Sequence, residues 1–246
     1  SFELLTDDYS SEYIRNTVTT LEQRMTEGWP CWAFSNHDVE RVASRWSETG
    51  KVNPAQCKML TALLASLRGS VCMYQGEELG LGEASVAFED LQDPYGITFW
   101  PNFKGRDGCR TPMPWDLADS SHAGFSEVKP WLPVDNAHKQ QSVAIQTDDN
   151  NSILNAYREF MAWRKSQTVL LEGDIEFIET PEPVLAFYRT LGKQRMLCMF
   201  NLSAKQTSID MPTSIVKEYT ELSHHSAKLD QGTTTLEPYA CFYAQC

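Results

Sequence analysis

The stretch that decides the fold is residues 32–41, which read Trp-Ala-Phe-Ser-Asn-His-Asp-Val-Glu-Arg. Residues 31–34 are apolar and lie between a proline and a polar turn, which predicts a short, fully buried strand. His37 and Asp38 follow its carboxyl end. In parallel sheets and barrels, active-site groups lie at this end because the loops there converge on one cavity. The stretch predicts an α/β fold with a site at His37 and Asp38. An Asp38 that only caps a helix, beside a turn histidine, is the alternative.

A second strand follows after one helix. Residues 54–67 carry one apolar stripe behind Asn53, an N-cap residue, and residues 71–74 are apolar again. This order predicts a right-handed β-α-β unit, and a further helix is predicted at residues 13–25. The second strand ends on Glu77 and Glu78. Neighbours on an extended tip point to opposite sides, so we expect this pair to be structural and not a catalytic pair that faces one bond.

Residues 82–144 are rich in proline, glycine, tryptophan and aspartate and show no sustained periodicity. So long an irregular segment in a compact domain is usually functional. Within it, residues 104–116 read Lys-Gly-Arg-Asp-Gly-Cys-Arg-Thr-Pro-Met-Pro-Trp-Asp. Trp100 and Trp115 fit two interpretations equally well, as platforms for a ligand ring or as plugs for the small core of the loop.

The hydrophobic pattern of the sequence changes after residue 170. A helix is predicted at residues 152–165, capped by Ser152. Beyond it, short apolar or alternating runs are separated by turn residues, at 175–178, 185–188, 196–200, 207–209, 219–222 and 240–243. Such runs predict an antiparallel β domain. We therefore predict two domains, residues 1–170 and residues 171–246.

The composition argues against several classes of partner. Lys and Arg number 21 against 33 Asp and Glu, and the net charge of -12 repels phosphate backbones and anionic lipid, so neither nucleic acid nor a membrane is expected as a partner. The seven cysteines are odd in number and lack Cys-x-x-Cys spacing, which favours buried, reduced thiols and a cytoplasmic location. The sequence shows no metal-ligand pattern, and we expect no cofactor.

Three stretches together resemble one family. Residues 34–41, residues 74–80 (Tyr-Gln-Gly-Glu-Glu-Leu-Gly) and residues 104–116 are similar to signature regions of the alpha-amylase superfamily of glycoside hydrolases, in its alpha-glucosidase and oligo-1,6-glucosidase branch. The resemblance implies the C-terminal part of a (β/α)8 TIM barrel followed by an antiparallel β-sandwich C-terminal domain. In that family, earlier strands of the barrel should carry the aspartate nucleophile and the glutamate acid/base, and neither motif occurs in this sequence. We expect a C-terminal fragment that is inactive alone and whose partner is the missing N-terminal part.

The resemblance also implies roles for individual residues. Asp38 matches the carboxylate that binds the hydroxyls of the cleaved sugar and stabilises the transition state. His37 matches a donor to the same sugar, and Arg106 matches the arginine of that subsite. Arg110 and Asp107 match the motif as well, and we expect them to be scaffold.

The activity implied is that of a retaining alpha-glucosidase acting on short oligosaccharides. Two alternatives stay open. One is a transglycosylating relative that acts on sucrose or trehalose, and the other is a non-catalytic amylase-like module that binds sugar or a partner.

Overall fold

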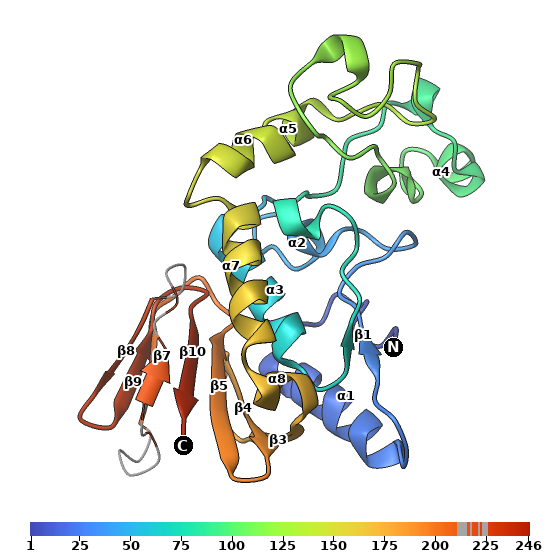
Figure 1. Cartoon of the computed structure of the whole chain (residues 1–246). Coiled ribbons are helices and arrows are strands. Elements are labelled where there is room, and N and C mark those ends of the chain that lie inside the picture. The colour runs from blue at the N-terminus through green and yellow to red at the C-terminus, as the bar shows by residue number, and fades with distance from the viewer. Residues whose placement is uncertain (211–215, 217, 221, 223–225) are drawn as a thin grey trace. The chain divides into compact units, whose positions relative to one another are not determined.

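The structure is a computed structural model that describes residues 1–210, 216, 218–220, 222 and 226–246. They form two compact units. The first consists of residues 1–33, 58–72 and 156–246, and the second of residues 34–57 and 73–155. The chain passes between them several times, so helices α3 and α7 contain residues of both (Figure 1).

The first unit contains a parallel pair of strands. β1 (Cys31–Trp32) pairs with β2 (Ser70–Val71), and the helix α3 (Pro54–Ser66) lies between them in sequence, as predicted. Both strands are shorter than predicted. The prediction of a fully buried strand is wrong for Cys31, which is exposed, whereas Trp32 is buried. Neighbouring side chains of a strand point to opposite faces, and only the face that carries Trp32 is buried.

The three predicted helices are all present, within two residues of the predicted bounds. They are α1 (Ser11–Arg24), α3 and α7 (Ile153–Lys165). Ser10, Asn53 and Ser152 each accept a backbone N–H of the first turn with a side-chain oxygen. These caps set the start of each helix because the first N–H groups of a helix have no partner inside it. A short helix, α8 (Thr168–Glu172), follows α7.

The C-terminal part of the first unit contains two antiparallel sheets. The five-stranded sheet has the order β3-β4-β5-β10-β7, and the three-stranded sheet has the order β6-β9-β8. Their bounds are Asp174–Ile178 (β3), Val184–Leu191 (β4), Gln194–Asn201 (β5), Thr207–Asp210 (β6), Glu218–Thr220 (β7), Ala227–Asp230 (β8), Thr233–Leu236 (β9) and Cys241–Gln245 (β10). β8 and β9 were not predicted. Residue 221, in the predicted strand 219–222, lies outside the described residues.

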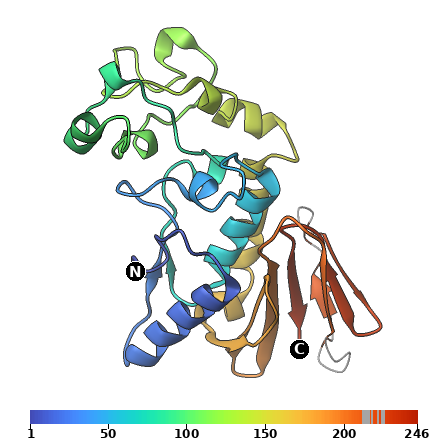
Figure 2. The same cartoon turned by 180° about the vertical axis from the view of Figure 1, so that it is seen from behind.

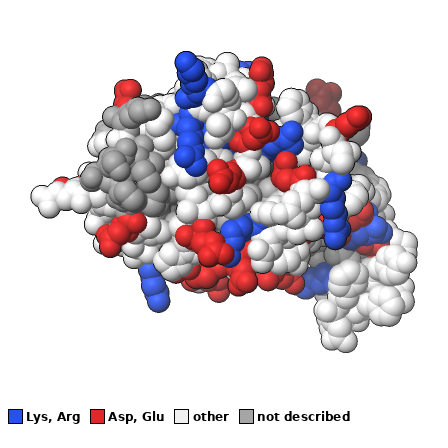
Figure 3. Space-filling model, turned by 90° about the horizontal axis from the view of Figure 1, so that it is seen from below, with Lys and Arg blue, Asp and Glu red and all other residues white. Residues whose placement is uncertain are grey.

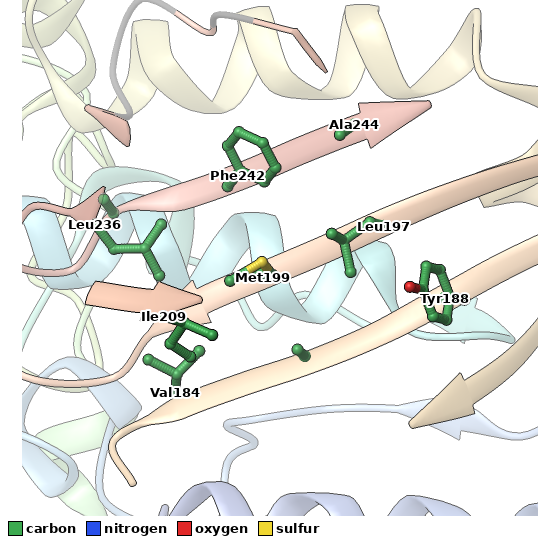
Figure 4. Close-up of a cluster of buried hydrophobic side chains, with 10 residues drawn as sticks. Val184, Tyr188, Leu197, Met199, Ile209, Leu236, Phe242 and Ala244 are labelled. Atoms are coloured by element: carbon green, nitrogen blue, oxygen red, sulfur yellow. The ribbon is translucent and has the colours of Figure 1, made fainter. Parts of the chain in front are cut away.

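The two sheets enclose one hydrophobic core, shown in Figure 4. Val184, Met199 and Phe242 come from the five-stranded sheet, while Ile209 and Leu236 come from the three-stranded sheet. All five are at least 90% buried. Two sheets with interdigitating inner faces make a β-sandwich, which confirms the predicted antiparallel domain.

Helices cover the other face of the five-stranded sheet. The ring of Tyr243 lies 5.8 Å from Phe160 and 4.9 Å from Trp163 between centroids, both on α7. Its hydroxyl lies 2.9 Å from the Ser66 hydroxyl at the end of α3. Helix α1 packs beside β3 and β4 (Figure 2), and Glu182 accepts two N–H groups of its first turn. The sheet is therefore tied to three helices of the first unit.

The second unit has little regular structure, as expected for residues 82–144. Its helices are α2 (Val42–Arg45), α4 (Pro94–Phe99), α5 (Asn136–Lys139) and α6 (Val143–Asp148), and its 3-10 turns are η1 (Glu77–Leu79), η2 (Phe88–Asp90), η3 (Asp107–Cys109) and η4 (Asp119–Ser121). Glu77 and Glu78 lie in η1, so the predicted extended tip is wrong at this point. The glycines on both sides of η1 have positive φ, which closes the turn.

Charged groups of both signs share the surface. On the face drawn in Figure 3, basic side chains lie among acidic ones. Among the described residues, no helix is long and apolar enough to cross a membrane. None of the seven cysteines forms a disulfide, and four of them are buried, as predicted: Cys57, Cys109, Cys198 and Cys241. Cys31 and Cys72 are exposed instead.

Candidate active site

The loop that carries Asp38 is fixed at both ends within the second unit. Phe34 packs against Trp46 with 4.9 Å between ring centroids, and the Ser35 hydroxyl accepts the N–H of Val42 at 2.8 Å. In the middle, the side-chain oxygen of Asn36 accepts the N–H of Asp38 at 2.8 Å. Such an Asx turn presets the backbone, so the carboxylate of Asp38 has a defined direction.

Two arginines share one oxygen of Asp38. Nη1 of Arg106 donates to Oδ1 at 3.1 Å, and Nη2 of Arg110 donates to the same Oδ1 at 3.0 Å. The other oxygen, Oδ2, lies 3.3 Å from Nε2 of His37. The side chains of Asp38 and His37 are 47% and 68% exposed. The structure thus brings together all three residues predicted for the site and leaves about half of the Asp38 side chain exposed.

Arg106 is held from behind by Asp93, whose side chain is fully buried. Oδ2 of Asp93 accepts both the backbone N–H and the Nε–H of Arg106 at 2.8 Å, and Oδ1 accepts Nη2–H at 3.1 Å. Bidentate pairing of this kind is stronger and more directional than an ordinary ion pair. The hydrogen bond from Arg106 holds the pKa of Asp93 well below its usual range, so the carboxylate stays ionised.

Two glycines allow the backbone to pack closely around the pair of Arg106 and Asp93. A Cβ on Gly96 would lie 2.5 Å from the carbonyl oxygen of Lys104, and one on Gly105 would lie 2.9 Å from Oδ2 of Asp93. Gly105 also has a φ of +75°, which favours glycine. Asp107, predicted as scaffold, is buried and accepts the N–H of Asp93 at 2.8 Å. Asp107 therefore fixes the backbone that carries Asp93.

Arg110, also expected to be scaffold, touches Asp38 itself. It donates from Nε to the backbone carbonyl of His37 at 2.7 Å as well. One turn of 3-10 helix, η3, separates it from Arg106. This contact and the role of Asp93 were not predicted. The sequence signals were the Arg-x-x-x-Arg spacing, which brackets a single turn, and the Asp-Pro pair of an N-cap, which the structure bears out in the bond from Tyr95 N–H to Asp93.

A buried cluster of ionisable groups contacts this loop through Ser35, also in the second unit. The N–H of Arg41 donates to Glu83 at 3.0 Å, and Nη1 of Arg41 donates to the carbonyl of Gln75 at 2.6 Å. Burial raises the pKa of Glu77 to about 8 and that of Glu83 to about 7. A hydrogen bond with Ser35 opposes the shift at Glu77. These contacts fit the predicted structural role of Glu77.

The two tryptophans singled out in the sequence are both at the surface. Trp100 is 36% exposed and its ring lies 5.6 Å from that of Phe88, while Trp115 is 50% exposed. Their role as ring platforms stays a prediction. In the part of the chain that the structure describes, no three His, Cys, Asp or Glu side chains are grouped so that they could hold a metal ion.

The arrangement suits a neutral, hydroxyl-rich ligand. The carboxylate of Asp38 accepts hydrogen bonds, and its Oδ2 lies beside the exposed imidazole of His37, which can donate one. The guanidinium groups of Arg106 and Arg110 balance the charge of Asp38 and of Asp93. The site therefore offers directional hydrogen bonds rather than a net charge.

Comparison with known families decides the identity of the chain. The model of the alpha amylase catalytic domain matches residues 3–173, and the model of the alpha-amylase SusG C-terminal domain matches residues 184–241. The chain belongs to the alpha-amylase family. Its β1-α3-β2 unit is part of the TIM-barrel catalytic domain of that family, and the sheets from β3 onward form the antiparallel β-sandwich that follows it.

Relatives of this alpha-amylase family chain carry glucosidase names. It is 47% identical over 213 residues to a probable alpha-glucosidase of Rhizobium meliloti, covering 86% of this chain and 38% of that protein. It is 29% identical over 239 residues to an oligo-1,6-glucosidase of Parageobacillus thermoglucosidasius, covering 89% and 42%. The chain thus spans about two fifths of the length of these relatives.

Solved structures of the alpha-amylase family share the fold. The alpha-glucosyl transfer enzyme XgtA superposes with a TM-score of 0.92 at 53% identity, over 100% of this chain and 45% of that one. The trehalulose synthase MutB superposes with a TM-score of 0.84 at 23% identity, over 99% and 50%. The second similarity shows the fold alone.

Proposed function

We propose that this chain is part of a retaining alpha-glucosidase that hydrolyses alpha-glucosidic bonds of short oligosaccharides. The observation that carries the proposal is Asp38, a half-exposed carboxylate with one oxygen held by two guanidinium groups and the other bound by neither. The 47% identity to a probable alpha-glucosidase supports it. We further propose that the nucleophile and the acid/base lie outside these 246 residues, that the chain alone is inactive, and that the protein works in the cytoplasm.

In the proposed mechanism, Asp38 helps to stabilise the transition state. In a retaining glycosidase, two carboxyl groups flank the bond, a covalent glycosyl intermediate forms, and the transition state resembles an oxocarbenium ion. Oδ2 of Asp38 accepts a hydrogen bond from a hydroxyl of the sugar whose glycosidic bond is cleaved. The bond is charge-assisted and strengthens as positive charge develops on the ring. His37 donates to the same sugar, and Arg106 keeps the carboxylate in place.

The test is Asp38→Asn in the native-length protein, meaning the protein at the length that its source makes. Asparagine keeps the shape but removes the charge, so kcat for a nitrophenyl alpha-glucoside is expected to fall about 100- to 1,000-fold. The melting temperature should change little because the side chain is half exposed. Asp148→Asn, at an exposed position at the end of α6, is the matched control. An unchanged kcat in Asp38→Asn refutes the assigned role.

A second candidate is transfer of the glucosyl group to an acceptor other than water. It is favoured by the 53% identical structure, which is described as an alpha-glucosyl transfer enzyme. Both reactions share the covalent intermediate and differ in which hydroxyl attacks it. With a sugar alcohol present, equal amounts of nitrophenol and free glucose indicate hydrolysis, and a deficit of glucose indicates transfer. No nitrophenol release by the native-length protein favours the non-catalytic module.

A further inference from the structure

Each carboxylate oxygen of Asp93 accepts two hydrogen bonds from residues of the site. Its Oδ2 accepts the backbone N–H and the Nε–H of Arg106, and its Oδ1 accepts Nη2–H of Arg106 and the N–H of Tyr95. The side chain is fully buried. Each oxygen thus faces two donors, and three of the four donors belong to one arginine.

This pairing fixes the direction of the guanidinium of Arg106. The same carboxylate holds the backbone and the far end of the side chain, which closes a ring and selects one rotamer of a residue that is otherwise flexible. The group left over is Nη1, and it donates to Oδ1 of Asp38 at 3.1 Å. The ring of Tyr95, 5.7 Å from the guanidinium carbon, flanks the arginine on one side.

As a consequence, the two oxygens of Asp38 have different partners. Oδ1 receives Arg106 and Arg110, whereas no arginine of the described residues reaches Oδ2, which lies 3.3 Å from His37. An Arg106 free to rotate could pair with either oxygen or with both. Its restraint by Asp93 keeps Oδ2 available as an acceptor.

We propose that Asp93 is a positioning residue: it aims Nη1 of Arg106 at Oδ1 of Asp38 and so reserves Oδ2 of Asp38 for a hydroxyl of the sugar. The inference rests on the proposed glucosidase function for its substrate. Its geometry stands on the hydrogen bonds alone. Asp93 acts through Arg106 and does not touch the sugar.

Asparagine cannot replace Asp93 in this position. Whichever way its amide is turned, the NH2 group faces two N–H donors, because both oxygens of Asp93 accept two hydrogen bonds. In Asp93→Asn, Arg106 therefore loses part of its support while the shape of the side chain is kept. Asp90→Asn, three residues earlier in η2, is the matched control.

The experiment is a double-mutant cycle in the native-length protein, with kcat/KM for a nitrophenyl alpha-glucoside and the melting temperature measured for each variant. Asp93→Asn and Arg106→Ala are each expected to lower kcat/KM about 10- to 100-fold. The double variant should equal Arg106→Ala, because Asp93 has nothing left to position. Multiplicative losses, or unchanged kinetics in Asp93→Asn, overturn the proposal, since a merely structural role would not couple to Arg106.

Two further measurements keep the result decisive. If Asp93→Asn does not fold, Asp93→Glu keeps the charge but moves it by one methylene group, and parent-like kinetics there overturn the proposal. Crystal structures of the parent and the folded variant test the geometry without activity. A kept contact from Nη1 of Arg106 to Oδ1 of Asp38 refutes the positioning role. Absence of glucoside hydrolysis by the parent refutes the proposed function instead.

Discussion

Glu77→Gln is expected to stabilise the protein at alkaline pH. Burial raises the pKa of Glu77 from 4.5 to about 8 in the folded state, and its Oε1 has no hydrogen-bond partner among the described residues. Between pH 4.5 and 8, the folded protein holds a proton that the unfolded chain has released. The free energy of unfolding therefore falls as the pH rises through this window, and the full penalty is present above pH 8.

The size of the effect follows from the two pKa values. Each tenfold difference in proton affinity corresponds to about 1.4 kcal/mol, so the whole window corresponds to about 5 kcal/mol as an upper limit. Glutamine has nearly the same shape, can still pair with Ser35 and never ionises. Glu77→Gln should match the parent near pH 5 and exceed it by about 2–5 kcal/mol at pH 9.

The assay is urea unfolding of parent and variant at intervals from pH 5 to pH 9, followed by tryptophan fluorescence. Glu83, with a pKa raised to about 7, adds a slope of the same sign to both proteins, so it cancels in the difference between them. Glu89→Gln, at an exposed position, is the control and should run parallel to the parent. Parallel curves for Glu77→Gln and the parent would refute the reasoning, because they would mean that Glu77 is ionised in the folded state.

Three more changes test the packing. Gly96→Ala should lower both the melting temperature and kcat/KM, because the added Cβ meets the carbonyl of Lys104 at 2.5 Å; parent-like values would mean that the turn can open freely. Tyr243→Phe should cost about 1 kcal/mol in urea unfolding, since it removes the bond to the Ser66 hydroxyl. Met199→Ala should cost about 2–5 kcal/mol because it leaves a cavity between the two sheets, and a loss under 1 kcal/mol would contradict the packing of that core.

Local patterns in the sequence were sufficient where one segment decides its own structure. The apolar stripe of residues 54–67 and its cap at Asn53 predicted α3, and the apolar runs on either side predicted the parallel pair. Strand lengths were wrong because pairing partners, not composition, decide where a strand ends. β8 and β9 were missed because Ala-Lys-Leu-Asp and Thr-Thr-Thr-Leu carry a weak apolar signal.

The site was predicted in part for the same reason. Asp38 and His37 follow a strand, and Arg106 lies in a recognisable motif, so each is visible in the sequence. The contacts that define their geometry are not. Arg110 and Asp38 are 72 positions apart in the sequence, and Asp93 and Arg106 are 13 positions apart. Loop closure of this kind depends on glycines that permit close approach, and a single sequence shows the glycine without showing what approaches it.

Two arginines on one oxygen of Asp38 also bear on how such a site changes over generations. Loss of Arg110 leaves the carboxylate of Asp38 with Arg106 as its guanidinium partner, whereas loss of Arg106 also removes the guanidinium that pairs with the buried Asp93. In the proposed glucosidase, substitution of Arg110 alone is therefore expected to weaken catalysis without abolishing it. The second arginine on Oδ1 thus makes the position of Arg110 tolerant of substitution over evolution, whereas Asp38, the carboxylate that both arginines share, is expected to tolerate none.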